Sequence, residues 1–389
     1  MVNFQVFSCA ISQKLRIAVN TRLLVSNKLD GIGYYAHEVL QRLVTEHPTV
    51  QFYFLFDRTP NPNFIYGNNV TPVILSPQAR HPILYFIWFH LRVRWWLKKN
   101  KPDVFYSPEG YLPPRDTTPL VNVIHDLNFE HFPDSLPKAE RFYYQHFFPK
   151  YASWSDHIIT VSDFSKQDIV KRYRISESKI STIYNGIRKV FNASEKPALF
   201  TEKYTKGKPF FLHVGTLHPR KNIEGIVSAF NLYRKLKEVP DTKLVLAGRK
   251  KWWSESMENA VKNSPFSKDI IFTDRLETEE LVSAYQSAIG TLVLSHFEGF
   301  GLPIVEAMSC GCPVIAANNS ALSEIGEEAA IMVDQNNAEE VAHQMHQLSM
   351  DSKFRSRVVK RGLEKCQQFS WDLASKFTWE IIKNTAKNA

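Results

Sequence analysis

Two carboxylates, Glu298 and Glu306, have a spacing that could place both in one cleft. Glu298 lies in a Gly-rich segment directly after the predicted strand 291–294, and Pro303 suits the first turn of a helix that would carry Glu306. One side chain would stand on a loop and the other about one turn inside the helix. Such a pair can act as general acid and base, or it can accept hydrogen bonds from sugar hydroxyls. The spacing does not choose between these roles.

A second group, Gly215, Arg220 and Lys221, follows the predicted strand 210–214 and comes just before a helical pattern that starts at Ile223. Cations at a helix N-terminus oppose the helix dipole by about 0.3–1 kcal/mol each, so a purely structural role would select against them. Free N–H groups at that end bind anions, and charge-assisted hydrogen bonds contribute about 1.5–3 kcal/mol each. Gly215 permits a tight turn. The segment therefore predicts a diphosphate site.

The elements around these groups follow one pattern. Short β-branched and aromatic runs alternate with longer amphipathic segments, which is typical of βαβ units and a mainly parallel sheet. A polar segment, 185–208, lacks sustained apolar periodicity and separates two series of strands. The predicted strands are 15–21, 52–56, 73–75, 104–106, 120–124, 157–161 and 180–184, then 210–214, 244–247, 271–273, 291–294, 314–317 and 331–333.

We therefore predict an α/β fold of two Rossmann-like domains that face each other across a cleft. The N-terminal domain would cover residues 1–190 and the C-terminal domain residues 191–370. Residues 371–385 have the pattern of an amphipathic helix, and the segment 371–389 would complete the first domain. Ligands of open α/β sheets bind at the carboxyl ends of strands, so the site should collect residues from both halves.

The composition excludes several classes of protein. Of the 389 residues, 44% are hydrophobic and 22% are charged, which excludes wholesale disorder, and four cysteines are too few for a disulfide framework. Cys310 and Cys312 are too small a set for a zinc site and indicate buried thiols. Residues 1–190 hold 23 Lys and Arg against 15 Asp and Glu, so nearly all of the net charge of +9 lies there. That excess favours an anionic partner, but it lacks the charge runs of a nucleic-acid-binding arm.

The expected location is the cytoplasm. Residues 1–20 lack the charged start and the long apolar core of a signal peptide. The most hydrophobic stretch, 83–97, is interrupted by Arg92 and Arg94 and is shorter than the ~20 residues that span a bilayer. Its spacing favours a packed helix, although the aromatic and basic residues 95–99 could instead lie on an anionic membrane.

The two groups belong to a longer pattern that resembles a known family. GTLHPRKN, at residues 215–222, is followed about eighty residues later by EGFGLPIVEAMSCGCPVI, at residues 298–315. This pattern is similar to that of the GT-B retaining glycosyltransferases of family 4, which carry two glutamates separated by seven residues. Further matches are VSDFSKQDIV, at residues 161–170, and the turn at Gly31 and Gly33. The resemblance spans almost the whole chain.

The resemblance implies a role for each matching residue. Arg220 and Lys221 would hold the diphosphate of a nucleotide sugar, Glu306 would bond the ribose and Glu298 would face the donor sugar. His125, at the end of the predicted strand 120–124, would reach that sugar from the N-terminal, acceptor-side domain. The other expected donor-binding residues are Gly31, Gly33, Gly215, Leu276 near the base, and the backbone of Phe300, Gly301 and Leu302.

The resemblance also implies the reaction. The transferase would move a hexose from a nucleotide sugar to a glycan or lipid-linked acceptor of a cell-surface polysaccharide, with peripheral contact at the cytoplasmic membrane face. His125 followed by Asp126 is similar to a mannosyltransferase-like branch, which favours GDP-mannose, and UDP-sugar-dependent glucosyl transfer is the alternative. The sequence contains no Asp-x-Asp motif, so neither a metal nor another cofactor is expected. Family members attack on the same face of the sugar, so Glu298 should orient the sugar rather than act as nucleophile.

Two other classes of function stay open. An NAD-dependent oxidoreductase would use the Gly31-x-Gly33-x-x-Ala36 pattern as its dinucleotide-binding turn. Asp57 would then bond the ribose, but the turn before the glycines is too long and the C-terminal groups would have no role. The other class is a noncatalytic sugar- or nucleic-acid-binding protein, which could stack bases on the aromatic residues of 85–96. The helical spacing of that segment favours a packed helix instead. No nucleic-acid partner is therefore expected.

Overall fold

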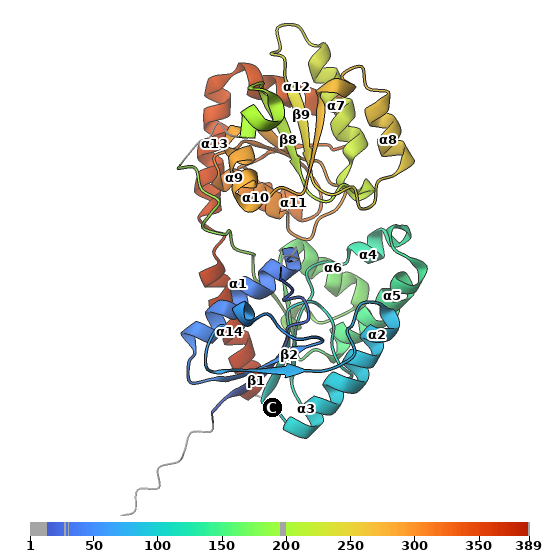
Figure 1. The fold of residues 1–389 in the computed structure, drawn as a ribbon, viewed down its shortest axis with the longest axis vertical. Helices are drawn as coiled ribbons and strands as arrows, with labels where there is room; N and C mark the ends of the chain where they lie inside the picture. The colour runs from blue at the N-terminus through green and yellow to red at the C-terminus, as the bar shows by residue number, and fades with distance from the viewer. Residues whose placement is uncertain (1–13, 27–28, 30, 195–199, 388–389) are drawn as a thin grey trace, which may run out of the picture. The chain divides into compact units, whose positions relative to one another are not determined.

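The computed structural model describes residues 14–26, 29, 31–194 and 200–387, and these residues form two sheets with helices around each (Figure 1). The first sheet has the strand order β3-β2-β1-β4-β5-β6-β7, and the second has the order β10-β9-β8-β11-β12-β13. Register pairs such as Ile17 with Phe52 and Phe211 with Leu244 are parallel. The predicted α/β class is confirmed. Most of the segment examined for a signal peptide lies outside the described residues.

All thirteen predicted strands are confirmed. Their apolar runs suit a parallel sheet, whose two faces are both covered. The strands of the first sheet are β1 (Arg16–Asn20), β2 (Gln51–Phe56), β3 (Val70–Ile74), β4 (Val104–Ser107), β5 (Leu120–Val123), β6 (His157–Thr160) and β7 (Ile180–Thr182). Those of the second are β8 (Phe210–Val214), β9 (Lys243–Ala247), β10 (Ile270–Asp274), β11 (Gly290–Val293), β12 (Val314–Ala317) and β13 (Ile331–Val333).

Helices alternate with the strands, as βαβ units require. Their bounds are α1 (Gly31–Glu46), α2 (Pro82–Phe86), α3 (Arg94–Asn100), α4 (Asn128–His131), α5 (Lys138–Trp154), α6 (Asp163–Tyr173), α7 (Ile223–Lys235), α8 (Glu255–Lys262), α9 (Thr278–Ser287), α10 (Leu302–Ser309), α11 (Ser320–Gly326), α12 (Ala338–Met350), α13 (Ser352–Cys366) and α14 (Trp371–Lys387).

The core of the second sheet holds its central strands in register. Phe211 of β8 and Leu292 of β11 are completely buried, and they pack in one cluster with Ile226 of α7 and Met345 of α12. The chain runs from β8 outward through β9 to β10, then returns to add β11 on the other side of β8. The carboxyl ends of β8 and β11 therefore form the topological switch point of this sheet, where open α/β sheets bind ligands.

The predicted C-terminal helix is confirmed as α14. Near its middle, Trp379 stacks on His47, with ring centroids 3.7 Å apart. Trp371, Ala374 and Ile382 of the same helix are buried, as an amphipathic pattern predicts, whereas Phe377 is 52% exposed.

The apolar segment 82–100 is helical throughout but not one regular α-helix. A π-helical stretch, Ile87–Val93, lies between α2 and α3. Trp88 and Phe89 are fully buried, so the expected packing is confirmed, whereas Trp95 is 54% exposed. Among the described residues, no helix has the length and apolar character needed to cross a membrane.

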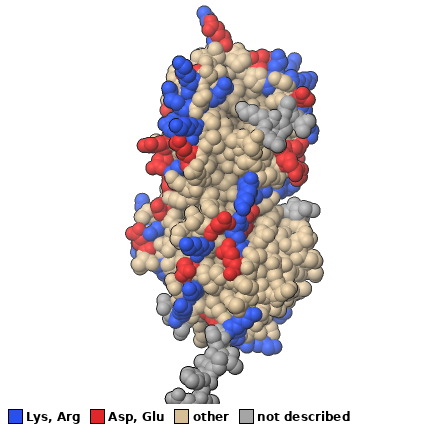
Figure 2. Space-filling model, turned by 90° about the vertical axis from the view of Figure 1, so that its left-hand side faces the viewer, with Lys and Arg blue, Asp and Glu red and all other residues tan. Residues whose placement is uncertain are grey.

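The chain divides into two compact units. The first contains residues up to 123, 150–157 and those from 378 onward, and the second contains residues 124–149 and 158–377. The second unit thus includes α4, α6 and β7 together with the entire second sheet. Basic and acidic side chains are interspersed on the face that Figure 2 shows, and neither sign covers it alone.

Candidate functional site

The first predicted group follows β8 at the switch point. Gly215 has a φ of +145°, a backbone conformation that favours glycine. Arg220 and Lys221 were expected at the start of a helix, but they lie in a separate 3₁₀ turn, Pro219–Lys221. The helix α7 begins only after Asn222, which has a left-handed φ of +56° and accepts a hydrogen bond from Gly225 N at 3.1 Å. The capping side chain ends the turn and starts the helix.

The second predicted group follows β11. Pro303 lies in the first turn of α10, as expected, and Gly301 precedes the helix with a φ of +104°. The backbone of the loop between β11 and α10 forms hydrogen bonds with two other segments, the turn that carries Arg220 and the start of α11. His296 N donates to Arg220 O at 2.8 Å, and Glu298 N donates to the Ser320 hydroxyl at 3.1 Å.

The two groups meet at the carboxylate of Glu298. Lys221 Nζ forms an ion pair with one carboxylate oxygen, and Arg220 Nη1 lies 3.0 Å from the other. The Arg220 guanidinium also donates to Phe297 O. These side chains are only 12–19% exposed. Although 77 residues separate Lys221 from Glu298, the adjacency of β8 and β11 brings them together.

The electrostatics of this cluster follow from burial and from the two cations. Burial alone would raise the pKa of Glu298, but Lys221 and Arg220 outweigh it and hold that pKa well below its usual range. Burial lowers the pKa of Lys221, and the neighbouring carboxylate opposes the shift. Glu298 and, more weakly, Asp126 oppose the charges of Arg220 and Lys221, and an anionic ligand could share these two fixed cations.

Two histidines that the sequence analysis missed support the first loop. His218 Nδ1 accepts a hydrogen bond from Arg220 N at 3.0 Å, which shapes the 3₁₀ turn. His213, on β8, is buried, and burial lowers its pKa to about 4. It is therefore neutral, and its Nδ1 donates to Leu292 O of β11 at 3.0 Å. An apolar strand pattern gives no signal for such a residue.

Glu306 lies on α10, where burial raises its pKa to about 7 and Arg188 and Tyr285 oppose that shift. Tyr285 Oη donates to Glu306 Oε2 at 3.3 Å, and Arg188 Nη2 lies 4.0 Å from Oε1. Near neutral pH this carboxyl can therefore both donate and accept hydrogen bonds. Arg188 also reaches Thr278 Oγ1 at 3.5 Å, two residues after the buried Leu276. Arg188 and Tyr285 were not expected from sequence.

The segment that carries His125 approaches the Glu298 loop through its backbone. A Cβ atom placed on Gly299 would lie 2.8 Å from His125 O and 2.5 Å from Asp126 Cβ. Glycine is required there because two chain segments touch. Asp126 Oδ1 accepts a hydrogen bond from Asn128 N at 2.9 Å, which matches a loop-acceptor role. The role of the His125 side chain stays a prediction.

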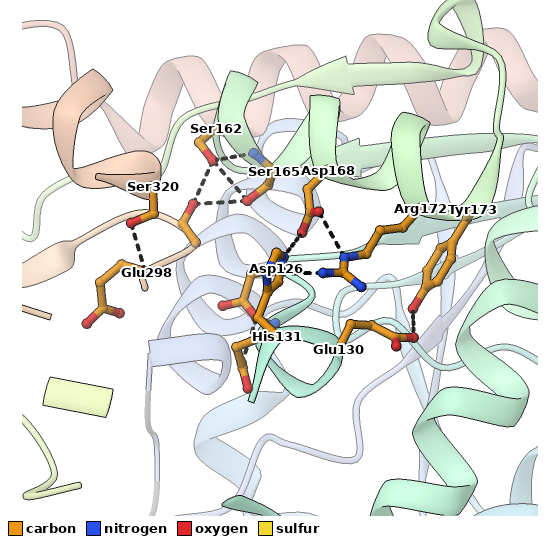
Figure 3. A network of polar contacts seen from close by, with 12 residues as sticks. Asp126, Glu130, His131, Ser162, Ser165, Asp168, Arg172, Tyr173, Glu298 and Ser320 are labelled. Atoms are coloured by element: carbon orange, nitrogen blue, oxygen red, sulfur yellow. Dashed lines mark hydrogen bonds and ion pairs between the residues drawn. The ribbon is translucent and has the colours of Figure 1, made fainter. Parts of the chain in front are cut away.

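Polar side chains of α4 and α6 extend the site (Figure 3). His131 Nε2 lies 2.7 Å from Asp168 Oδ2, and Arg172 reaches both residues. The His131 ring lies against Phe297, with centroids 4.5 Å apart. Ser162 donates from the start of α6 to Gly299 O at 2.7 Å. Phe297 and Gly299, on either side of Glu298, are thus contacted by residues of α4 and of the start of α6.

Other expected donor-binding residues are placed as follows. The Phe300 ring packs edge-on against Phe369 at 5.7 Å, so its backbone is the part that could serve a ligand. Leu302 begins α10. Gly31 and Gly33 lie in the first turn of α1 in the other compact unit, and their role stays a prediction.

Two alternatives can be weighed against the described residues. Asp57, the ribose acid of the oxidoreductase interpretation, accepts hydrogen bonds from Arg58 Nε at 2.6 Å and from Ala79 N at 2.9 Å, so its oxygens are already engaged. Cys310 and Cys312 are free buried thiols, as predicted. Within the described part of the chain, no group of three or more His, Cys, Asp and Glu could hold a metal ion.

Comparisons with known proteins match both halves of the chain. Residues 29–189 match the model of Glycosyltransferase Family 4, and residues 195–365 match Glycosyl transferases group 1. O-antigen chain mannosyltransferase B of Escherichia coli is 27% identical over 358 residues, which cover 88% of this chain and 93% of that protein.

Solved structures agree on the fold. Sucrose-phosphate synthase from Thermosynechococcus elongatus has a TM-score of 0.75 and 18% identity, covering 97% of this chain and 100% of that one. HepE of Anabaena in complex with UDP-glucose has a TM-score of 0.71 and 15% identity, covering 95% and 100%. The predicted GT-B fold, with two Rossmann-like domains, is confirmed.

Proposed function

Because the chain belongs to the group 1, family 4 glycosyltransferases, we propose that it transfers a hexose from a nucleotide sugar to a glycan or lipid-linked acceptor in cell-surface polysaccharide synthesis. The observation that carries this proposal is the cluster of Arg220, Lys221 and Glu298 at the switch point of the second sheet. GDP-mannose is the proposed donor, supported by the mannosyltransferase name of the Escherichia coli relative. The proposed setting is the cytoplasm.

In this proposal Arg220 and Lys221 bind the diphosphate. Cleavage of the bond to the sugar leaves negative charge on the nucleoside diphosphate, and fixed cations in a water-poor site stabilise that charge. Both side chains are held by the fold before a ligand arrives, so little reorganisation is needed. Two such cations could do this work without a metal ion, which is part of the proposal.

The neighbouring groups would orient the rest of the donor. Glu306, with a pKa near 7, can exchange hydrogen bonds with ribose hydroxyls, and Leu276 would border the base. Glu298 would accept hydrogen bonds from the sugar, assisted by the backbone of Phe300, Gly301 and Leu302. Gly31 and Gly33 would approach the phosphates, and His125 would reach the sugar.

We propose that the reaction retains the anomeric configuration. Glu298 is paired with two cations, which makes its carboxylate a weak nucleophile, so a covalent sugar intermediate on it is disfavoured. The acceptor hydroxyl would attack on the face from which the diphosphate departs. An oxygen of that diphosphate would then take the acceptor proton, while Arg220 and Lys221 stabilise the remaining charge.

The test supplies GDP-mannose and UDP-glucose separately, without acceptor, and follows released sugar by proton NMR. We expect hydrolysis of GDP-mannose with the α-anomer appearing first, and no effect of a chelator. Release of the β-anomer first would contradict retention, and loss of turnover on chelation would contradict a metal-free reaction. Preferred turnover of UDP-glucose would favour the alternative donor, which the HepE complex brings into consideration.

A matched pair of variants links the activity to the cluster. Arg220→Ala with Lys221→Ala removes the proposed diphosphate ligands. Arg234→Ala with Lys243→Ala removes an Arg and a Lys that pair with Asp269 elsewhere in the same unit. We expect the first double variant to lose turnover and the second to keep it. Equal loss in both would contradict the proposed role.

We also propose that the segment 82–100 contacts anionic membrane lipids at the interface. Ile83, Leu91 and Trp95 are 54–68% exposed on it, and Lys99 lies beside the Trp95 ring. Apolar side chains with flanking cations suit a lipid interface. Trp95→Ser and Lys99→Glu should each reduce sedimentation with phosphatidylglycerol vesicles. Equal binding to neutral vesicles, or unchanged binding by both variants, would contradict this contact.

A further inference from the structure

Two buried hydroxyls, those of Ser162 and Ser165 (Figure 3), donate hydrogen bonds to the carbonyl oxygen of Gly299. Ser162 Oγ donates to it at 2.7 Å and Ser165 Oγ lies at 3.3 Å. Both serines are at most 2% exposed. A buried carbonyl that receives hydroxyl donors is held in one orientation, because losing them would leave it unsatisfied.

The start of α6, which supplies these hydroxyls, is itself fixed. Glu324 of α11 accepts hydrogen bonds from Asp163 N and Phe164 N, both at 2.9 Å. The same helix α11 begins with Ser320, whose hydroxyl accepts from Glu298 N. Helix α11 therefore holds the donors of the Gly299 contact at one place and the Glu298 backbone at another.

The hydrogen bonds to the Gly299 carbonyl also restrain the N–H of the next residue. The carbonyl of Gly299 and the N–H of Phe300 belong to one planar trans peptide and point in opposite directions. Fixing the carbonyl toward Ser162 therefore fixes the Phe300 N–H away from it. The backbone of Phe300 is among the groups proposed above to contact the donor.

We propose that Ser162 is a positioning residue, which sets the Gly299–Phe300 peptide and, with it, the placement of Glu298 and of the Phe300 N–H toward the donor. This inference rests on the proposed function for its kinetic consequence, but the orientation of the peptide can be measured without turnover. Ser165, at the longer distance, supports the same carbonyl.

Ser162 has a second role that a test must separate. Its side chain caps α6 by accepting a hydrogen bond from Ser165 N at 3.1 Å. Ser254 is a matched control, because it caps α8 in the same manner by accepting from Met257 N at 3.2 Å. Ser162→Ala and Ser254→Ala therefore lose comparable caps, and only the first loses a donor to Gly299.

The kinetic test measures release of GDP from GDP-mannose and of UDP from UDP-glucose. For the donor that the wild-type protein uses, we expect Ser162→Ala to lower kcat about tenfold, as loss of one hydrogen bond at a buried acceptor predicts, with KM changed less than about twofold. Ser254→Ala should leave both constants unchanged. An unchanged kcat in Ser162→Ala, or an equal loss in Ser254→Ala, would overturn the proposal. A wild-type protein that turns over neither donor would contradict the proposed function instead.

The structural test measures amide hydrogen exchange over residues 297–302 in the protein without donor. Ser162→Ala should speed exchange of the Glu298 N–H, which donates to the Ser320 hydroxyl, at least about tenfold relative to wild type, because the loop gains freedom. Ser254→Ala should leave it unchanged. Exchange that is identical in all three proteins would overturn the positioning role, whatever the substrate is.

Discussion

Glu298→Gln tests whether the carboxylate acts as an internal counter-ion. The substitution keeps the shape of the side chain and removes its charge, leaving Lys221 and Arg220 buried without their anion. The low pKa of Glu298 contributes stability that is present above the unfolded value near 4.5 and is lost as the pH falls through the folded pKa. At pH 7 the full contribution is present.

The expected loss can be estimated from the geometry. Removing one partner of a buried ion pair costs about 3–5 kcal/mol, and the retained amide oxygen can still accept a hydrogen bond, so we expect about 3 kcal/mol. For a unit of this size that corresponds to a fall in Tm of roughly 6–12 °C. Asp269→Asn is the control, since Asp269 pairs with Arg234 at 2.8 Å and Lys243 at 2.5 Å. It should cost a similar amount.

Added inorganic pyrophosphate should separate the two variants in thermal unfolding. An anion that binds the vacated cations at a hundred times its Kd stabilises by about 2.7 kcal/mol, which would restore most of the loss in Glu298→Gln. Asp269→Asn should gain no more than wild type, because Asp241 still pairs with Arg234 at 3.1 Å in that variant. Equal gains in the two variants, or a smaller gain in Glu298→Gln than in wild type, would refute the counter-ion reasoning.

Two further substitutions address other parts of the site. Between pH 4.5 and 7 the raised pKa of Glu306 makes folded wild-type protein progressively less stable, because folding then requires the carboxyl to take up a proton. Glu306→Gln has no such group, so its free energy of unfolding should rise relative to that of wild type by about 2–3 kcal/mol over this range. Urea unfolding measures this difference, and a difference that does not change with pH would contradict it. Gly299→Ala should lower kcat at least about tenfold, because its Cβ would lie 2.5 Å from Asp126 Cβ and force a shift of the loop. Gly207→Ala, whose Cβ meets nothing within 4 Å, should cost about 1 kcal/mol of stability without changing kcat.

Much of the fold could be predicted because its strands are apolar on both faces. The runs at Phe210–Val214 and Val314–Ala317 are bounded by polar or Gly/Pro residues, so their position is set by local composition. The π-helical stretch Ile87–Val93 could not be predicted, since its apolar spacing is shared with an α-helix. The separate turn before α7 was also missed, because Asn222 signals a cap only once its left-handed backbone is known.

The sequence predicted the main residues of the site but not the contacts between them. Arg220, Lys221 and Glu298 were each singled out by residue type, but their pairing depends on β8 and β11 lying side by side, which local sequence does not encode. Ser162 lies in the matching segment 161–170, but that match assigns it no role, and Ser320 looks like an ordinary helix-start serine. Their contacts with the Glu298 loop arise from the packing of α6 and α11, so their importance appears only in the assembled fold.

The ion-pair cluster also bears on how the proposed transferase would handle its donor. Arg220 and Lys221 are neutralised in part by Glu298 when no ligand is bound, which avoids the cost of two unpaired buried cations. Binding of a diphosphate would place a second anion on the same two cations, so affinity would be lower than two bare cations could give. Glu298 would stay beside Lys221 and Arg220 and would accept hydrogen bonds from the sugar with its remaining lone pairs. The same side chain would thus stabilise the empty site and orient the donor in the filled one.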